Sequence, residues 1–172
     1  MSRIMEDSFE PVSKLKDVEK LLDGFEYSVH AMTDEGYDYL EDESHRCILL
    51  KNKAGEELFI DFEDEFTLSF RQWHTHYFAE NYDYERMIRD MEAILHNNAH
   101  TVIIYCKDEW MGSILIHGKI KSKEAVIKEI TDLLREPEFL QKLNRNGAEV
   151  YFQFWNSDFN RELSLLPGEI TA

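Results

Sequence analysis

The sequence predicts an α+β protein, with a mostly antiparallel or mixed sheet of about seven or eight strands and three or four helices packed mainly on one face. Three observations lead to this prediction. Apolar and polar side chains alternate along several short segments, which is typical of half-buried strands. Apolar side chains recur three and four residues apart in other segments, which is typical of amphipathic helices. Most neighbouring strands are joined by short polar turns, which favours antiparallel pairing.

The first quarter of the chain is expected to contain one helix, one strand and a long loop. The helix covers residues 13–23, with Ser13 as its N-cap, and Gly24 stands where helices commonly end in a left-handed residue. A strand with alternating apolar residues follows over residues 25–32. Residues 33–43 contain six carboxylates and no cation, so we expect an exposed loop there.

The middle of the chain is expected to form a β-meander, because three alternating segments are joined by short polar turns. In the last of these segments, Phe66, Leu68 and Phe70 share one side, whereas Thr67 and Ser69 share the other. The expected strands cover residues 46–52, 56–62 and 65–71.

The remaining chain alternates between helices and pairs of strands. Ser122 is the expected cap of one helix, and Pro137 is expected to interrupt that helix before one or two further helical turns. In chain order, we expect a helix over residues 82–96, strands over 100–107 and 111–117, a helix over 122–134, a helical segment over 138–143, and strands over 148–155 and 162–166.

The length and composition predict one globular domain over residues 1–172. Apolar residues make up 43% and aromatic residues 13% of the chain, which excludes a disordered acidic tail. The apolar runs are too short to span a membrane, and the first residues lack the apolar stretch of a signal peptide. Cys47 and Cys106 lie in apolar strand-like segments, where we expect buried, reduced thiols. Together these features predict a cytoplasmic protein.

The charge is strongly negative and unevenly distributed. There are 35 acidic against 19 basic residues, a net charge of −16, which argues against binding to nucleic acid or to an anionic membrane. Residues 1–92 hold 24 acids and 10 bases, a balance of −14, whereas residues 93–172 hold 11 acids and 9 bases, a balance of −2. The sequence therefore predicts one acidic flank.

Two histidines give the chain its strongest chemical signal. If the strand continues through the sequence Trp-His-Thr-His-Tyr, His74 and His76 share one face about 7 Å apart. Such a pair can bind a metal ion when further ligands complete the site, or can act as acid and base on a phosphate ester. The alternative is a structural aromatic patch around Trp73 and Tyr77. No glycine-rich phosphate loop or nucleophile elbow occurs, so we predict no cofactor.

Acidic segments that also contain tyrosine favour a different role. Carboxylates can steer a basic protein toward the surface, and tyrosine rings can anchor it there. The alternative is a loop that only confers solubility. The predicted partner-binding residues are Asp34, Glu35, Tyr37, Asp38, Tyr39, Glu41, Asp42, Glu43, Trp73, Tyr77, Tyr82 and Tyr84.

Residues 66–70 followed by residues 73–77 resemble a strand-plus-WHxHY stretch found in small uncharacterised bacterial proteins. Some of these look like immunity proteins of polymorphic toxin systems, which neutralise a sibling toxin in the cytoplasm. The likeness covers about fifteen of the 172 residues. It implies an inhibitor role and transfers no catalytic residue to this chain.

Two main hypotheses follow from the sequence. The leading one is a non-enzymatic, acidic protein-binding module that engages a basic partner, and the resemblance extends it to an immunity protein that neutralises a basic toxin. The second is a small metal-assisted or histidine-based hydrolase centred on His74 and His76. A purely structural subunit is a third.

Overall fold

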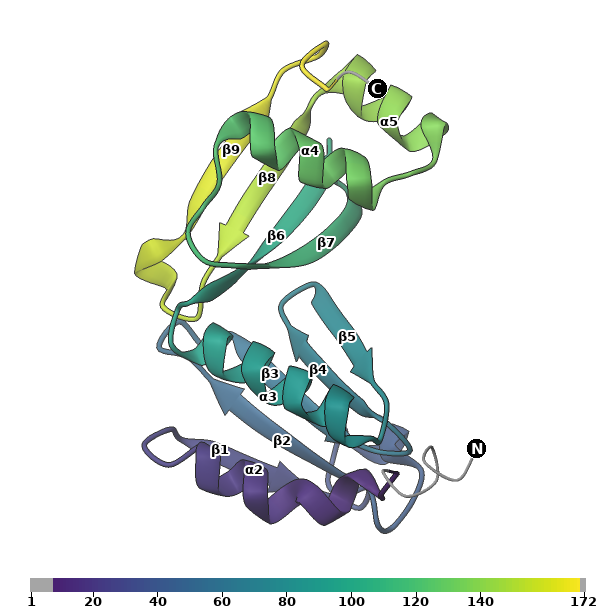
Figure 1. The fold of residues 1–172 in the computed structure, drawn as a ribbon, viewed down its shortest axis with the longest axis vertical. Coiled ribbons are helices and arrows are strands. Elements are labelled where there is room, and N and C mark those ends of the chain that lie inside the picture. The colour runs from purple at the N-terminus through teal and green to yellow at the C-terminus, as the bar shows by residue number, and fades with distance from the viewer. Residues whose placement is uncertain (1–7, 171–172) are drawn as a thin grey trace. The chain divides into compact units, whose positions relative to one another are not determined.

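The computed structural model describes residues 8–170, and the chain divides into two compact units, Met1–Glu92 and Ala93–Ala172 (Figure 1). The described residues form four α-helices and nine strands, with five strands in one antiparallel sheet and four in another. The α+β class and the antiparallel pairing are therefore confirmed. The single domain over residues 1–172 stays a prediction.

The prediction of one sheet with seven or eight strands is wrong, because the described strands form two separate sheets. The helix α3 (Asn81–Leu95) separates the fifth strand from the sixth. Antiparallel neighbours usually form where a short turn returns the chain beside itself, and a helix of 15 residues removes that link. Each sheet is accordingly built from strands on its own side of α3.

The first unit begins with a single 3₁₀ turn, η1 (Pro11–Lys14), followed directly by α2 (Leu15–Leu21). The predicted cap at Ser13 is wrong, because Pro11 starts the turn with its fixed φ and the Ser13 hydroxyl donates to the carbonyl of Glu10 at 2.6 Å. The expected left-handed residue after the helix is confirmed, since Gly24 has a φ of 89°.

The five strands of the first unit form a meander in chain order. The strand over residues 66–70 does not continue through the WHTHY sequence, because residues 73–77 form a strand of their own. Arg71 adopts a left-handed φ of 59°, the chain reverses, and Phe70 pairs with Trp73. The strands are β1 (Tyr27–His30), β2 (Arg46–Lys51), β3 (Glu57–Phe62), β4 (Phe66–Phe70) and β5 (Trp73–Tyr77).

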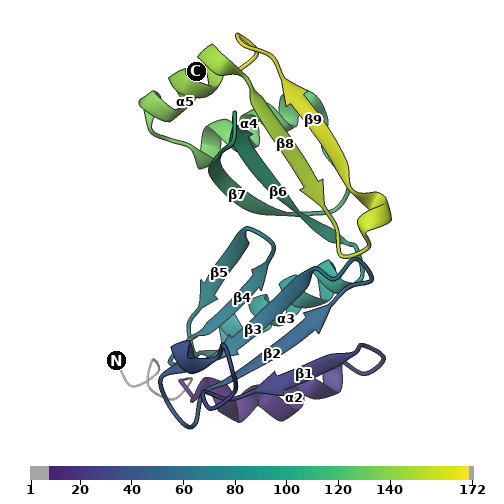
Figure 2. The ribbon, with the colours of Figure 1, turned by 180° about the vertical axis from the view of Figure 1, so that it is seen from behind.

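One face of this sheet carries the apolar core. Helices α2 and α3 both lie on that face, as the front and back views in Figures 1 and 2 show. The strand register aligns apolar residues in rows, for example Ile48 with Ile60 and Ile60 with Leu68, and all three are fully buried. Val18 of α2 and Met87 of α3 are also fully buried. The apolar alternation in the sequence therefore selects the inner face.

The second unit arranges its four strands in the order β7-β6-β8-β9. Helices α4 and α5 lie on one face of this sheet (Figure 2). Their buried residues, among them Val126, Ile130 and Leu143, belong to one apolar core with strand residues such as Val102 and Val150. The elements are β6 (Ala99–Cys106), β7 (Glu109–His117), α4 (Lys123–Leu133), α5 (Pro137–Asn146), β8 (Ala148–Gln153), the 3₁₀ turn η3 (Ser157–Phe159) and β9 (Arg161–Leu165).

Several local predictions hold in the second unit. Ser122 caps α4, since its side chain accepts a hydrogen bond from the backbone N–H of Ala125 at 3.3 Å. Pro137 stands at the start of α5, which runs further than the one or two turns expected.

Cys47 and Cys106, one in each unit, are buried and free, in agreement with the expected buried thiols.

Candidate protein-docking site

Residues 31–45, called the acidic loop from here on, lie on the face of the first sheet opposite its helices (Figure 2). The loop contains one 3₁₀ turn, η2 (Asp38–Leu40), and Leu40 is fully buried. Beside it, the Tyr39 hydroxyl donates a hydrogen bond of 2.7 Å to Oδ1 of Asp61, which is itself almost fully buried on β3. The loop is therefore attached to the sheet through buried contacts.

Further contacts hold both ends of the acidic loop. The rings of His30 and Tyr37 stack at 4.2 Å with 2° between their planes. The backbone N–H of Ala31 donates to the Asp34 carboxylate at 2.9 Å. At the other end, Nδ1 of His45 lies 2.7 Å from the carbonyl oxygen of Leu40. A loop with this many fixed points loses little conformational entropy when it binds a partner.

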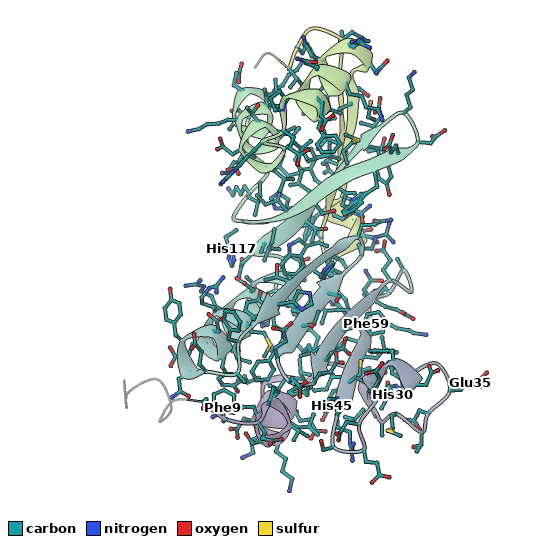
Figure 3. The ribbon with its side chains drawn as sticks, turned by 90° about the vertical axis from the view of Figure 1, so that its right-hand side faces the viewer. Phe9, His30, Glu35, His45, Phe59 and His117 are labelled. Carbon is teal, nitrogen blue, oxygen red and sulfur yellow. The ribbon has the colours of Figure 1, made fainter. Side chains whose placement is uncertain are left out.

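The carboxylates of the acidic loop face solvent. Figure 3 shows Glu35 projecting away from the sheet. Within residues 8–170 these groups have no Lys or Arg side chain in ion-pair distance. Arg46, which is close in sequence, instead donates to the carbonyls of Glu43 and His45 at 2.5 and 2.7 Å. The exposed carboxylates are Asp34, Glu35, Asp38, Glu41, Asp42 and Glu43.

Two of these carboxylates also shape the loop itself. Asp42 accepts hydrogen bonds from the Ser44 backbone N–H at 2.8 Å and from its hydroxyl at 2.6 Å, and these bonds lower the pKa of Asp42. Asp34 accepts from Ala31, as described above. The side chains of Glu35, Asp38 and Glu43 have no such role among the described residues, so they can meet a partner without any change in the loop.

Beneath the loop, a row of polar side chains crosses the sheet. The register pairs His30 with Cys47, Cys47 with Asp61, Asp61 with Thr67, and Thr67 with His76. A histidine, a cysteine and an aspartate in one row resemble a nucleophilic site in their chemistry. The environment of Cys47 does not favour a nucleophile. Burial is the main cause that raises the pKa of its thiol well above the usual value, and the nearby charge of Asp61 is the second.

The imidazole of His30 is also turned to other partners. Its Nε2 atom lies 2.7 Å from the Ser28 hydroxyl, and its Nδ1 atom lies 3.4 Å from the Asp34 carboxylate. A cysteine becomes a nucleophile when a base or a positive charge favours its thiolate. Cys47 is fully buried and lacks that arrangement, so we assign it to the support of the acidic loop.

The structure corrects two of the predicted partner-binding residues. Trp73 and Tyr77 occupy the inner face of β5, where Trp73 is 6% exposed and Tyr77 is fully buried. The Tyr77 hydroxyl donates to Asp90 of α3 at 2.6 Å, and burial, with this bond, raises the Tyr77 pKa. Both residues belong to the core because the turn at Arg71 fixes which side chains of β5 face inward.

Of the other predicted tyrosines, Tyr82 is the most accessible. It lies at the start of α3 and is 71% exposed. Tyr84 is half-buried, and its ring lies 6.1 Å from Phe9 and 5.7 Å from Phe66. Tyr39 keeps 45% of its surface exposed although its hydroxyl is bonded to Asp61. The tyrosines therefore differ in role, and Tyr39 and Tyr82 offer the largest exposed rings.

His74 and His76 share the outer face of β5, as the alternation predicted. Their ring centroids lie 5.3 Å apart, with the rings nearly perpendicular. Nδ1 of His76 lies 2.9 Å from the Glu65 carboxylate and 3.0 Å from the Thr67 hydroxyl. Among the described residues, no group of three or more His, Cys, Asp and Glu side chains could hold a metal ion. The pair alone is two ligands, one or two fewer than a zinc site uses.

The residues that support the acidic loop were not predicted from the sequence; they are His30, Cys47 and Asp61. A signal in the sequence could have found Asp61. Alternation over residues 57–62 puts Leu58, Ile60 and Phe62 on one face and leaves Asp61 on the other, with Glu57 and Phe59. A carboxylate in a strand needs a partner when a loop covers it, and Tyr39 supplies that partner.

Comparison of the chain with protein-family models, with curated proteins and with solved structures finds no match in any of the three. The resemblance of residues 66–77 to immunity proteins therefore stays a prediction. Among residues 8–170, every helix is too short or too polar to cross a lipid bilayer.

Proposed function

We propose that this chain is an acidic protein-binding module whose acidic loop docks a basic protein. One observation supports the proposal above all: a loop fixed by buried contacts presents six exposed carboxylates that have no Lys or Arg partner within residues 8–170. Unpaired like charges held close together repel one another, and a cationic partner relieves that repulsion.

The net charge of the whole first unit also favours a basic partner. Residues 1–92 have a balance of −14, so the field around this unit attracts cations over a distance set by the ionic strength. Such a field mainly raises the association rate, whereas exposed aromatic groups slow dissociation. In this proposal the carboxylates steer the partner, and the exposed ring of Tyr39 forms part of the contact.

More specifically, we propose that the chain is a cytoplasmic inhibitor of a basic toxin. The support for this form of the proposal is the resemblance of the WHTHY stretch to immunity-type proteins and the expectation of reduced thiols at Cys47 and Cys106. A carboxylate-rich loop can occupy a cleft that binds phosphate groups, because it carries the same sign of charge as the substrate. A toxin gene beside the gene of this chain would support this form, and a toxin that remains fully active with the protein in excess would contradict it.

The experiment is a pull-down from the native host with three baits, at about 0.05 and about 0.3 M salt, where the screening length falls from about 14 to about 6 Å. The first bait is the wild-type protein. The second is the triple variant Glu35→Gln, Asp38→Asn, Glu43→Gln, which removes charge without touching the contacts that hold the loop. The third is a matched control, Glu124→Gln, Asp132→Asn, Glu138→Gln, with three exposed carboxylates of the second unit.

We expect a basic partner that binds the wild type and the control at low salt. The loop variant should lose about tenfold in affinity, since three exposed charge contacts of up to ~0.5 kcal/mol each are removed. Equal binding by the loop variant and the wild type, or binding that does not respond to salt, would contradict the proposal.

A further inference from the structure

The second unit contains a cleft that the acidic loop does not use. It has a volume of about 680 Å³, within the range of about 300–1,000 Å³ typical of small-molecule sites. Its lining comes from three places in the chain: the turn after α3, the turn after β7, and the segment from the end of β8 to the start of β9. The lining residues used below are Asn98, Gly118, Lys119, Phe154, Phe159 and Arg161.

The charge of this cleft is opposite to that of the chain. The chain has 35 acidic residues, yet none of the residues lining the cleft is acidic, and two of them are cations. Arg161 is held in place because it donates to the backbone carbonyls of Asp158 and Asn160 at 3.2 and 2.7 Å. In the described part of the chain, neither Lys119 nor Arg161 has a carboxylate partner. The cleft therefore offers positive charge that no carboxylate of residues 8–170 neutralises.

The other wall of the cleft is aromatic. The rings of Phe154 and Phe159 meet edge to face at 6.0 Å, and Phe159 is 48% exposed. An exposed phenyl ring can accept a second ring by stacking, which adds to the gain from burial of apolar surface. One ligand could therefore place an apolar ring against the phenylalanine wall and a negative group beside the two cations.

A buried histidine supports the back of the cleft. His100 of β6 is fully buried, its ring stacks on Phe154 at 4.7 Å, and its Nδ1 atom lies 3.2 Å from the carbonyl oxygen of Gly118. Its Nε2 atom is buried and has no hydrogen-bond partner among the described residues. A buried polar atom without a partner costs stability, so its presence behind the cleft suggests a functional reason to keep it.

We propose that this cleft binds a small amphipathic anion, an aromatic ring that bears one carboxylate or phosphate group. The ring stacks on Phe159, and the anionic group lies between Lys119 and Arg161. Asn98 offers a further amide at the rim. This site is independent of the acidic loop, because every residue of the cleft belongs to the second unit.

The test is a titration of the full chain followed by amide NMR. Phenyl phosphate and phenylacetate supply the ring with each of the two anionic groups. Benzyl alcohol supplies the ring without charge, and inorganic phosphate supplies the charge without the ring. We expect the first two to shift the amides of Gly118, Lys119 and Phe159, and the last two to bind at least about tenfold more weakly, since each lacks one contact.

Two variants make the test specific. Lys119→Ala removes a cation of the cleft and should weaken the binding of the aromatic anions about fivefold. Lys128→Ala removes an exposed lysine of α4 outside the cleft and should change nothing. The proposal is overturned if millimolar phenyl phosphate leaves the cleft amides unshifted, if Lys119→Ala binds as well as the wild type, or if benzyl alcohol or inorganic phosphate binds as tightly as the aromatic anions.

Discussion

At the scale of single residues, two tyrosine–aspartate pairs fix opposite faces of the first sheet. Tyr77 donates to Asp90 on the inner face, and Tyr39 donates to Asp61 on the outer face. Burial comes first among the causes that raise the pKa of each tyrosine, and the bond to the carboxylate adds to it. The first pair joins β5 to α3, whereas the second joins the acidic loop to β3.

Removing the inner hydroxyl should therefore destabilise the protein. We expect Tyr77→Phe to lower the free energy of unfolding by about 1–2 kcal/mol, because Asp90 loses a buried donor. Urea denaturation measures the change. Tyr82→Phe, at an exposed position, is the control and should change stability by less than about 0.5 kcal/mol. An equal effect of both variants would show that the Tyr77–Asp90 bond adds nothing to stability.

His100 predicts a dependence of stability on pH. Burial lowers the pKa of His100 in the folded protein below its usual value of 6.5. As the pH falls through about 6.5, the unfolded chain takes up a proton that the folded protein resists, so the free energy of unfolding decreases. We expect the slope of this free energy between pH 7 and pH 5 to be smaller in His100→Leu than in the wild type.

Other groups titrate in the same range, so the comparison is between slopes. His74→Leu removes an exposed imidazole and is the control for the loss of a histidine as such. Denaturation at several pH values gives both slopes. If His100→Leu has the same slope as the wild type, burial of His100 does not reduce its proton uptake.

At the scale of the elements, helix ends were predicted unevenly. The N-cap of α4 could be predicted because Ser122, a good capping residue, stands directly before a segment whose apolar residues recur every three or four positions. The start of the first helix was missed, because Pro11 and Ser13 are both acceptable first-turn residues and only the chain path selects between them. The turn at Arg71 was missed for a related reason: an arginine with φ of 59° gives no sequence signal, whereas a glycine would.

Two glycines at helix ends offer a matched test of backbone conformation against crowding. Gly147 follows α5 with φ of 77°, and a Cβ atom there would lie 2.4 Å from the carbonyl oxygen of Leu165. Gly24 follows α2 with φ of 89° and has nothing within 4 Å of the same position. We expect Gly24→Ala to cost about 1–2 kcal/mol and Gly147→Ala at least about 3 kcal/mol.

Thermal or urea unfolding of the two variants checks this difference. Gly24→Ala is the control, since it adds the conformational strain without the clash. Equal losses of stability would mean that β9 moves away from Gly147 at little cost, and that the end of α5 is not tightly packed against it.

At the scale of the whole chain, the division into units coincides with the division of charge. The first unit ends at Glu92 and the second begins at Ala93. The charge balance of −14 belongs to the first unit. The acidic flank predicted from the sequence is therefore a property of one unit. Within that unit, the acidic loop holds six of the carboxylates on one face of the sheet.

This asymmetry predicts the response of the protein to salt. Repulsion among the carboxylates destabilises the folded chain, so the free energy of unfolding should rise as salt screens it. The rise should be smaller in the triple variant Glu35→Gln, Asp38→Asn, Glu43→Gln than in the matched variant of Glu124, Asp132 and Glu138. Urea denaturation at low and high salt measures both. The same rise in the two variants would contradict a concentration of repulsion in the acidic loop.

The class of the protein, most of its elements and the sign of its charge could be predicted from the amino-acid sequence. These depend on local periods and on composition, which need no knowledge of distant contacts. The sequence also placed His74 and His76 on one face, because a strand alternates strictly.

Which side chains each face of the sheet covers depends on the tertiary structure. It moved Trp73 and Tyr77 from the predicted docking surface into the core, and it joined Tyr39 to Asp61 across 22 positions of the chain. It also brought Lys119, Phe159 and Arg161 to one cleft. Such groupings depend on strand register and on the path of the loops, which the packing of the whole unit selects and no local pattern encodes.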